Sequence, residues 1–158
     1  MSRLPDNFLW GGAIAANQAE GGYREGGRGL ASMDVVPQGN ESFEYMFGNV
    51  QDLSFRDGRH YPALEGNDFY HHYKEDIRLM GEMGFKVFRM SVSWSRIFPN
   101  GGEEEPNEEG LKFYEDVFRE LKKYQIEPLV TICHYDFPLH LVTEYGGFKN
   151  RKLIHFFK

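Results

Sequence analysis

The chain has 158 residues and a formal net charge of −6, from 18 basic and 24 acidic side chains, which argues against a general nucleic-acid binder because such proteins need a basic face. One cysteine excludes a disulfide scaffold, and an aromatic content of 16% excludes a wholly disordered chain. The longest apolar runs are strand-length and residues 1–7 lack a secretory pattern, so we expect a cytoplasmic protein without a membrane-spanning segment.

The first part of the chain predicts a strand and a long loop. Residues 8–10 (FLW) run into a segment rich in glycine and alanine, and we interpret them as a strand. Residues 17–67 show no clean period and mix Gly, Pro, Ser and Asn with aromatic residues. A loop of about fifty residues is unusual in a compact domain unless it is functional.

An amphipathic helix and a buried strand are predicted next. The helix shows one apolar stripe with spacings of 4, 4 and 3, made of Phe69, Tyr73, Ile77 and Met80. Asn67 or Asp68 is expected to cap its start, and Gly84 to end it. Residues 85–92 then have the length and composition of a strand.

The same pattern repeats further along the chain. Asn107 is expected to cap a second helix, whose stripe has spacings of 3, 4 and 3 and consists of Leu111, Tyr114, Phe118 and Leu121. Residues 127–133 predict a third strand, and a third helix begins near Lys149. Strands that alternate with helices imply crossover connections and a parallel sheet.

About three such β/α units, with a long loop after the first strand, are too few to close a (β/α)₈ TIM barrel, which needs about 250 residues. They could form a small open sheet. The helical pattern that reaches residue 158 without a cap favours the N-terminal part of a barrel.

Polar side chains stand at or near the ends of the predicted strands, where a parallel barrel builds its sites. They are Gln18, Glu20, Arg89, His134, Tyr135 and Asp136. Arg89 lies inside a strand, a costly place for a permanent charge unless a carboxylate meets it. The glycine-rich residues 21–27 lack the strand and helix of a dinucleotide fingerprint, and the adjacent His71 and His72 are interpreted as helix surface.

Several motifs, in this order and spacing, resemble glycoside hydrolase family one over essentially the whole chain. They are FLWGGA (8–13), QAEG (18–21), NDFY (67–70), FRMSVSWSRIFP (88–99), HYDFP (134–138) and YGGF (145–148). The resemblance implies that residues 1–158 are the N-terminal portion of a single (β/α)₈ domain that hydrolyses β-glycosides with retention.

The resemblance also implies roles for particular residues. Gln18 and His134 would hydrogen-bond hydroxyls of the non-reducing sugar, and Tyr135 would belong to an aromatic rim that stacks on the sugar. A buried Arg89 would hold the nucleophilic carboxylate ionised. The resemblance implies neither a cofactor nor a metal ion.

Two segments resemble the 6-phospho-β-glucosidase branch of that family: residues 31–34 (ASMD) and 58–62 (GRHYP). Plain β-glucosidases commonly have Trp at the position of Met33, and the family often has Trp at Tyr135 and Phe148. A plain β-glucosidase or β-galactosidase therefore remains the alternative.

Retaining hydrolysis needs two carboxyl groups about 5–5.5 Å apart. The resemblance places both catalytic glutamates beyond Lys158, and Glu20 and Glu144 do not match their motifs, so we expect the chain alone to be inactive. A sugar-binding or assembly protein without catalysis is a further hypothesis, in which the open edge of the third strand pairs with another chain. A flavodoxin-like phosphate-binding domain is disfavoured by the length of the first loop.

Overall fold

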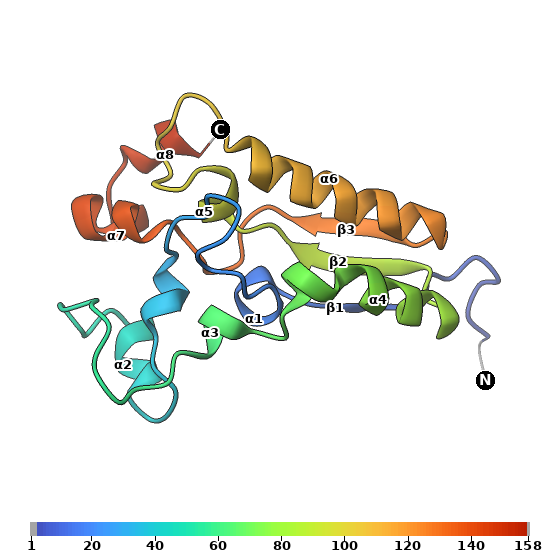
Figure 1. The fold of residues 1–158 in the computed structure, drawn as a ribbon, viewed down its shortest axis with the longest axis horizontal. Helices are drawn as coiled ribbons and strands as arrows, with labels where there is room; N and C mark the ends of the chain where they lie inside the picture. Colours follow the sequence, from blue (N-terminus) through green and yellow to red (C-terminus); the bar gives the residue numbers. More distant parts are fainter. Residues whose placement is uncertain (1–2, 158) are drawn as a thin grey trace.

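The computed structural model describes residues 3–157. At its centre lies a three-stranded parallel sheet in the order β1 (Gly11–Ala13), β2 (Val87–Ser91) and β3 (Glu127–Thr131) (Figure 1). Gly11 pairs with Val87, and Val87 pairs with Glu127, so the three strands are in register from their first residues. The predicted parallel sheet with helical crossovers is confirmed.

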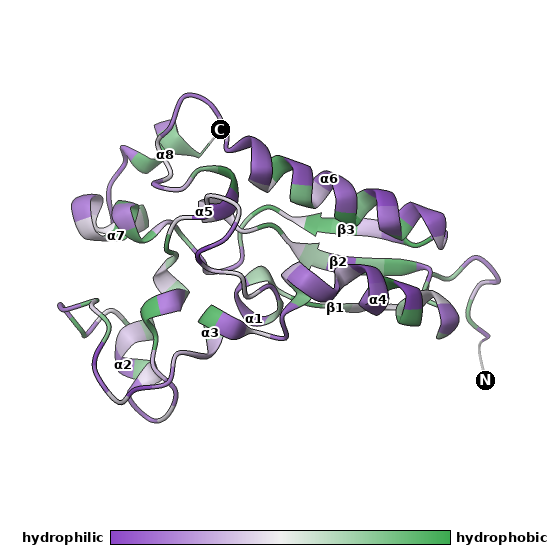
Figure 2. Cartoon of the chain, viewed as in Figure 1, coloured by the Kyte–Doolittle hydropathy of each residue, from purple (hydrophilic) through white to green (hydrophobic). Residues whose placement is uncertain are grey.

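Two long helices lie beside the sheet (Figure 1). In chain order, α4 (Phe69–Glu82) connects β1 to β2, and α6 (Glu108–Lys123) connects β2 to β3. The main core fills the space between them and the sheet. Its buried members include Phe69, Ile77, Phe88, Met90, Tyr114, Val117 and Leu121. Hydrophobic residues concentrate along β2 and β3, whereas the outward side of α6 is largely hydrophilic (Figure 2).

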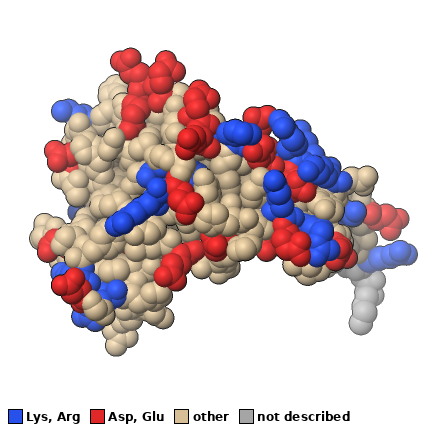
Figure 3. Space-filling view, in the orientation of Figure 1, with Lys and Arg blue, Asp and Glu red and all other residues tan. Residues whose placement is uncertain are grey.

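The outer surface of the two helices carries charges of both signs (Figure 3). Several of them pair at helical spacing, such as Lys112 with Asp116 and Arg78 with Glu75. On α6 the buried face differs in part from the predicted stripe. Leu111 is exposed, while Phe113 and Val117 are buried. Apolar residues recur at helical spacing along more than one line of this helix, so the spacing alone does not show which line faces the core.

The two long helices start where the sequence predicts, but the predicted capping of each helix by a side-chain hydrogen bond is wrong. Asp68 and Asn107 occupy the N-cap positions without a side-chain cap hydrogen bond. The Asp68 carboxylate instead contacts His71 Nδ1 at 2.5 Å. Asn107 Nδ2 donates to the carbonyls of Gly26 (2.6 Å) and Arg96 (2.9 Å), so this side chain ties the long loop to the segment before α6.

The first strand and the C-terminal helices also differ from expectation. The strand lies at Gly11–Ala13 and not at residues 8–10, although the Trp10 carbonyl accepts a hydrogen bond from Lys86 N–H at 2.7 Å. Near the end of the chain, α7 (Leu139–Tyr145) and the 3₁₀ turn η2 (Gly147–Lys149) precede α8 (Leu153–Phe156). The sequence predicted only the last of these helices.

The long loop contains short helical turns and little regular structure. These are α1 (Ala16–Ala19), the 3₁₀ turn η1 (Ser32–Val35), α2 (Ser42–Met46) and α3 (Pro62–Glu65); a further short helix, α5 (Trp94–Ile97), follows β2. Leu129, which pairs with Arg89 on the face of the sheet opposite α4 and α6, is 56% exposed, and Ile132, just after β3, is 65% exposed. Self-association through the edge of β3 stays a prediction. Among residues 3–157 no helix has the length and apolar character needed to cross a membrane.

Gly110 offers a test of the packing between α6 and α5. A Cβ at this position would lie 2.1 Å from the Arg96 carbonyl oxygen. Gly110→Ala should therefore lower the free energy of unfolding by about 1–3 kcal/mol, the usual cost of overpacking, although alanine is the better helix former. Lys112→Ala on the exposed face is the control. A stabilised Gly110→Ala protein in urea unfolding would contradict the packing described here.

Candidate functional site

The candidate site lies where β2 and β3 end. A cavity of about 460 Å³ opens there, and its walls come from the two strands, the loop after β3 and the C-terminal segment. It is lined by Arg89, Thr131, Cys133, His134, Tyr135, Phe137, Phe148 and Phe157. Three of the four residues proposed from the sequence for sugar binding or nucleophile support, Arg89, His134 and Tyr135, therefore meet in one cavity.

Arg89 is exposed, so the expectation of a buried arginine in β2 is wrong for this chain. Its neighbours in the strand, Phe88 and Met90, face the core, and strand alternation turns Arg89 to the opposite face. Its Nε donates to Thr131 Oγ1 on β3 at 3.1 Å. The guanidinium is thereby held against the cavity wall with donors left for an anionic partner.

His134 and Tyr135 form an aromatic pair at the mouth of the cavity. Their ring centroids are 5.0 Å apart with an interplanar angle of 87°, an edge-to-face arrangement. Tyr135 is 71% exposed, so its ring offers an apolar plate beside a histidine that can donate or accept a hydrogen bond.

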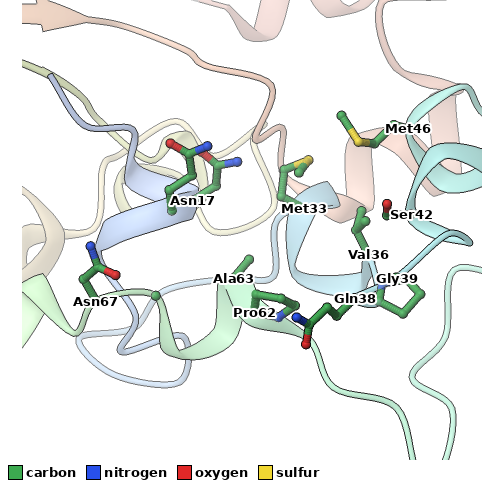
Figure 4. Close-up of a pocket in the computed structure, with 13 residues that line it drawn as sticks. Asn17, Met33, Val36, Gln38, Gly39, Ser42, Met46, Pro62, Ala63 and Asn67 are labelled. Carbon is green, nitrogen blue, oxygen red and sulfur yellow. The ribbon is translucent and has the colours of Figure 1, made fainter.

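Gln18 does not reach this cavity. It lines a second one of about 450 Å³ between α1, the η1–α2 loop and α3 (Figure 4). This second cavity carries amide side chains such as Asn17, Gln38 and Asn67 among apolar ones such as Met33 and Met46. Asn17 is buried and its Oδ1 has no hydrogen-bond partner.

Arg96 on α5 is fully buried, and its sequence position gives no sign of this. Its Nε donates to Glu20 Oε2 at 2.9 Å, and its Nη2 donates to the Gly21 carbonyl at 3.1 Å. The guanidinium also lies over the ring of Tyr70, 4.3 Å from the centroid. Glu20 follows α1, so this pair joins the end of α1 to α5.

Tyr114 of α6 completes the arrangement. Its hydroxyl donates to Glu20 Oε1 at 2.5 Å and accepts a hydrogen bond from Ser93 N–H at 2.6 Å. Burial and the charge of Glu20 raise the pKa of Tyr114 well above its ordinary value, so the phenol stays protonated and remains a donor. In the sequence, the Glu20–Arg96 pair is indicated only by the motifs that contain the two residues, QAEG (18–21) and FRMSVSWSRIFP (88–99).

A second buried ion pair joins Arg28 to Asp34. Arg28 Nη1 lies 2.6 Å from Asp34 Oδ2, and both side chains are almost fully buried. Burial alone would lower the pKa of Arg28, but the Asp34 carboxylate outweighs it and the pKa rises. Asp34 also accepts a hydrogen bond from Ala31 N–H at 2.8 Å, so it fixes the start of η1.

Asp136 directly follows the aromatic pair in the chain and is fully buried. Burial raises its pKa to about 7 and outweighs the backbone N–H groups of Asp136 and His134, which lower the pKa; the charge of Glu20 adds to the rise. Its Oδ1 accepts a hydrogen bond from His134 N–H at 3.3 Å, while Oδ2 has no partner. Burial and Asp136 together raise the pKa of the Cys133 thiol to about 11, which makes Cys133 a poor nucleophile at neutral pH.

The histidines of α4 stay on the surface, as expected. His71 contacts Asp68 and Glu25, whose hydrogen bonds raise its pKa. Within residues 3–157 no cluster of three or more His, Cys, Asp or Glu side chains could hold a metal ion.

Comparison with known proteins gives one consistent result. The sequence model of Glycosyl hydrolase family 1 matches residues 1–158. The 6-phospho-beta-glucosidase AscB of Escherichia coli is 57% identical over 157 residues, which cover 99% of this chain and 33% of that protein. The aryl-phospho-beta-D-glucosidase BglH of Bacillus subtilis is 58% identical over 156 residues, which cover 99% and 31%. The chain thus spans about a third of the length of these curated relatives.

Solved structures agree with the fold. A mutant of the rice Os3BGlu6 beta-glucosidase, in a covalent complex with Glc, matches with a TM-score of 0.78 at 35% identity, covering 97% of this chain and 29% of that one. A second structure of the rice enzyme matches with a TM-score of 0.76. The three strands and their helices therefore have the arrangement of an N-terminal portion of a (β/α)₈ barrel, as the sequence predicted.

Because the Glu20–Arg96 pair is buried, a single substitution in it should lower the stability of the fold strongly. Glu20→Gln leaves a buried guanidinium without its counter-charge and should lower the free energy of unfolding by about 3–5 kcal/mol. Glu115→Gln removes one partner of the exposed pair with Arg119 and is the control, with little expected loss. Equal losses for the two variants in urea unfolding would refute the role given to the buried pair.

The raised pKa of Asp136 predicts that the stability of the fold depends on pH. Its folded pKa of about 7 exceeds the unfolded value of about 3.9. The folded chain therefore holds the extra proton between these values, and stability falls as pH rises through this window. Asp136→Asn cannot ionise, so its stability relative to wild type should increase from pH 4 to pH 7, by about 1.4 kcal/mol for each pH unit between the two pKa values.

The control for this experiment is Asp57→Asn, at an exposed position of the long loop. Its unfolding curve should run parallel to that of the wild type over the same pH range. A parallel curve for Asp136→Asn as well would show that this carboxyl does not titrate with a raised pKa.

Proposed function

The chain belongs to Glycosyl hydrolase family 1, and from that premise we propose that it supplies part of the sugar-binding rim of a retaining β-glycosidase that acts on 6-phospho-β-glucosides. The observation that carries the proposal is the cavity at the ends of β2 and β3, where Arg89, His134 and Tyr135 meet. Family membership alone does not identify a substrate, so the proposal rests on these side chains and on the relatives.

The side chains suit a sugar. Tyr135 presents an exposed ring, and His134 stands at a right angle to it, so one can stack on a pyranose face while the other hydrogen-bonds a hydroxyl. Arg89 keeps free donors at the cavity wall and is placed to stabilise an anionic nucleophile supplied from elsewhere. Gln18 would contact the same sugar only if that sugar also reaches the second cavity, which Gln18 lines.

The relatives support the phosphorylated substrate. The names of AscB and BglH describe enzymes of 6-phospho- or aryl-phospho-β-glucosides, and both exceed 55% identity. The segment ASMD, which resembles that branch, forms the η1 region here, with Asp34 buried against Arg28.

A plain β-glucosidase is the second candidate. It is favoured by the match to the rice structures and by Beta-glucosidase 42 of Arabidopsis thaliana, which is 41% identical over 156 residues.

Hydrolysis needs carboxyl groups that this cavity lacks. No Asp or Glu is among its lining residues within the described part of the chain. Glu20 is buried against Arg96, and Glu144 is exposed on α7. We therefore propose that the catalytic pair of the working enzyme lies outside the 158 residues.

The first test is an assay of the purified 158-residue chain. We expect no hydrolysis of 4-nitrophenyl β-D-glucoside 6-phosphate or of its unphosphorylated counterpart, because two carboxyls at catalytic separation are needed. Turnover above background that disappears when one of the chain's own glutamates is replaced would overturn this part of the proposal.

The second arm of the test completes the chain with the remaining two thirds of the E. coli relative. The chimaera should hydrolyse the phosphorylated substrate, and His134→Ala should lower kcat/KM by about tenfold or more, the equivalent of one lost hydrogen bond to the sugar. Gln38→Ala, at an amide of the second cavity, is the matched control and should have little effect. Equal kcat/KM for the His134→Ala and Gln38→Ala chimaeras would contradict the proposed site.

A further inference from the structure

Tyr135 has an unusual backbone. Its φ is +66°, in the left-handed region that residues other than glycine, asparagine and aspartate seldom occupy. Such a conformation persists only where surrounding contacts hold it, and it is found preferentially at functional sites. The conformation matters here because it sets the direction of the Tyr135 ring at the mouth of the cavity.

The contacts that hold it come from a residue 103 positions earlier in the chain. The Ser32 hydroxyl donates to the Tyr135 carbonyl at 3.1 Å and accepts a hydrogen bond from Phe137 N–H at 3.2 Å. The backbone N–H of Ser32 donates to the Phe137 carbonyl at 2.7 Å. One serine therefore bridges the backbone on both sides of Asp136.

The backbone around Ser32 is itself held in place by hydrogen bonds. The backbone around it pairs with the segment after the aromatic pair, through the antiparallel bridge between Ala31 and Pro138 and the hydrogen bond from Leu139 N–H to the Leu30 carbonyl at 2.8 Å. Asp34, buried against Arg28, accepts from Ala31 N–H and holds the start of η1. The long loop thus has a rigid point directly against the loop after β3.

We propose that Ser32 is a positioning residue: its hydroxyl holds Tyr135 in the left-handed conformation and so orients the Tyr135 and His134 rings toward the cavity. The consequence for sugar binding rests on the proposed function. The effect on the backbone of Tyr135 does not.

Asp136 is the other group that could fix this turn, through its Oδ1 and His134 N–H at 3.3 Å. That contact lies on the N-terminal side of Tyr135, whereas Ser32 holds the carbonyl of Tyr135 itself. The two roles are therefore separable by substitution at position 32 alone.

The experiment uses the 158-residue chain labelled with ¹⁵N and ¹³C. The sign of φ at Tyr135 is read from its amide–Hα coupling and intraresidue NOE in the wild type and in Ser32→Ala, Ser32→Thr and Ser54→Ala. Ser54, exposed and elsewhere in the long loop, is the matched control. We expect Ser32→Ala to lose the positive φ, Ser32→Thr to retain it because the hydroxyl is kept, and Ser54→Ala to match the wild type.

The second readout is the affinity for phenyl β-D-thioglucoside 6-phosphate of the chimaera completed with the E. coli relative, measured by calorimetric titration. Ser32→Ala should weaken binding by about tenfold, as expected for the loss of a hydroxyl that makes two hydrogen bonds. In a Tyr135→Gly background, where positive φ carries no steric cost, the same substitution should change affinity by less than about twofold. A general structural defect would weaken binding equally in both backgrounds.

The outcomes separate the two proposals. An unchanged positive φ in Ser32→Ala, or equal weakening of binding in both backgrounds, overturns the positioning role. If the wild-type chimaera does not bind the thioglucoside, the proposed function fails, and the change in φ on its own then decides whether Ser32 positions the aromatic pair.

Discussion

The rest of this structure depends on one buried ion pair, Arg96 with Glu20. Two opposite charges removed from water stabilise a fold only when their geometry and remaining hydrogen bonds are satisfied. Here Glu20 receives Arg96 and the Tyr114 hydroxyl, and Arg96 also reaches the Gly21 carbonyl and the face of Tyr70. The pair therefore joins α1, α4, α5 and α6 at one point.

The long loop after β1 is ordered by polar contacts more than by a core of its own. Within the loop, Arg28 pairs with Asp34. Asn107 ties the loop to the start of α6, and Ser32 ties it to the loop after β3. These contacts place the loop against the ends of the strands. The aromatic pair at the cavity is consequently supported from a distant part of the chain.

The sequence predicted those elements that have a strong local pattern. The stripes of α4 and α6 and the apolar runs of β2 and β3 carry enough hydrophobic periodicity to be found without knowledge of the fold. The family motifs predicted the barrel ancestry, and three of the four proposed site residues do share a cavity. Local pattern suffices for these because each lies within, or directly after, a strand.

What the sequence could not predict depends on tertiary context. β1 is a three-residue strand of glycine and alanine, and it is defined only by its pairing with β2. Asn107 looks like a helix cap but uses its amide to reach Gly26, which no local rule predicts. Arg89 is expected to be buried because it lies in a strand, yet strand alternation exposes it, while Arg96, outside any strand, is fully buried.

In the proposed function, the cavity at the ends of β2 and β3 binds the sugar. The most direct measurement is a crystal structure of the chimaera completed with the E. coli relative, soaked with phenyl β-D-thioglucoside 6-phosphate. We expect one pyranose ring against Tyr135, with His134 within hydrogen-bond distance of a hydroxyl on that ring. A pyranose confined to the second cavity, beside Asn17 and Gln38 and out of reach of His134, would contradict it.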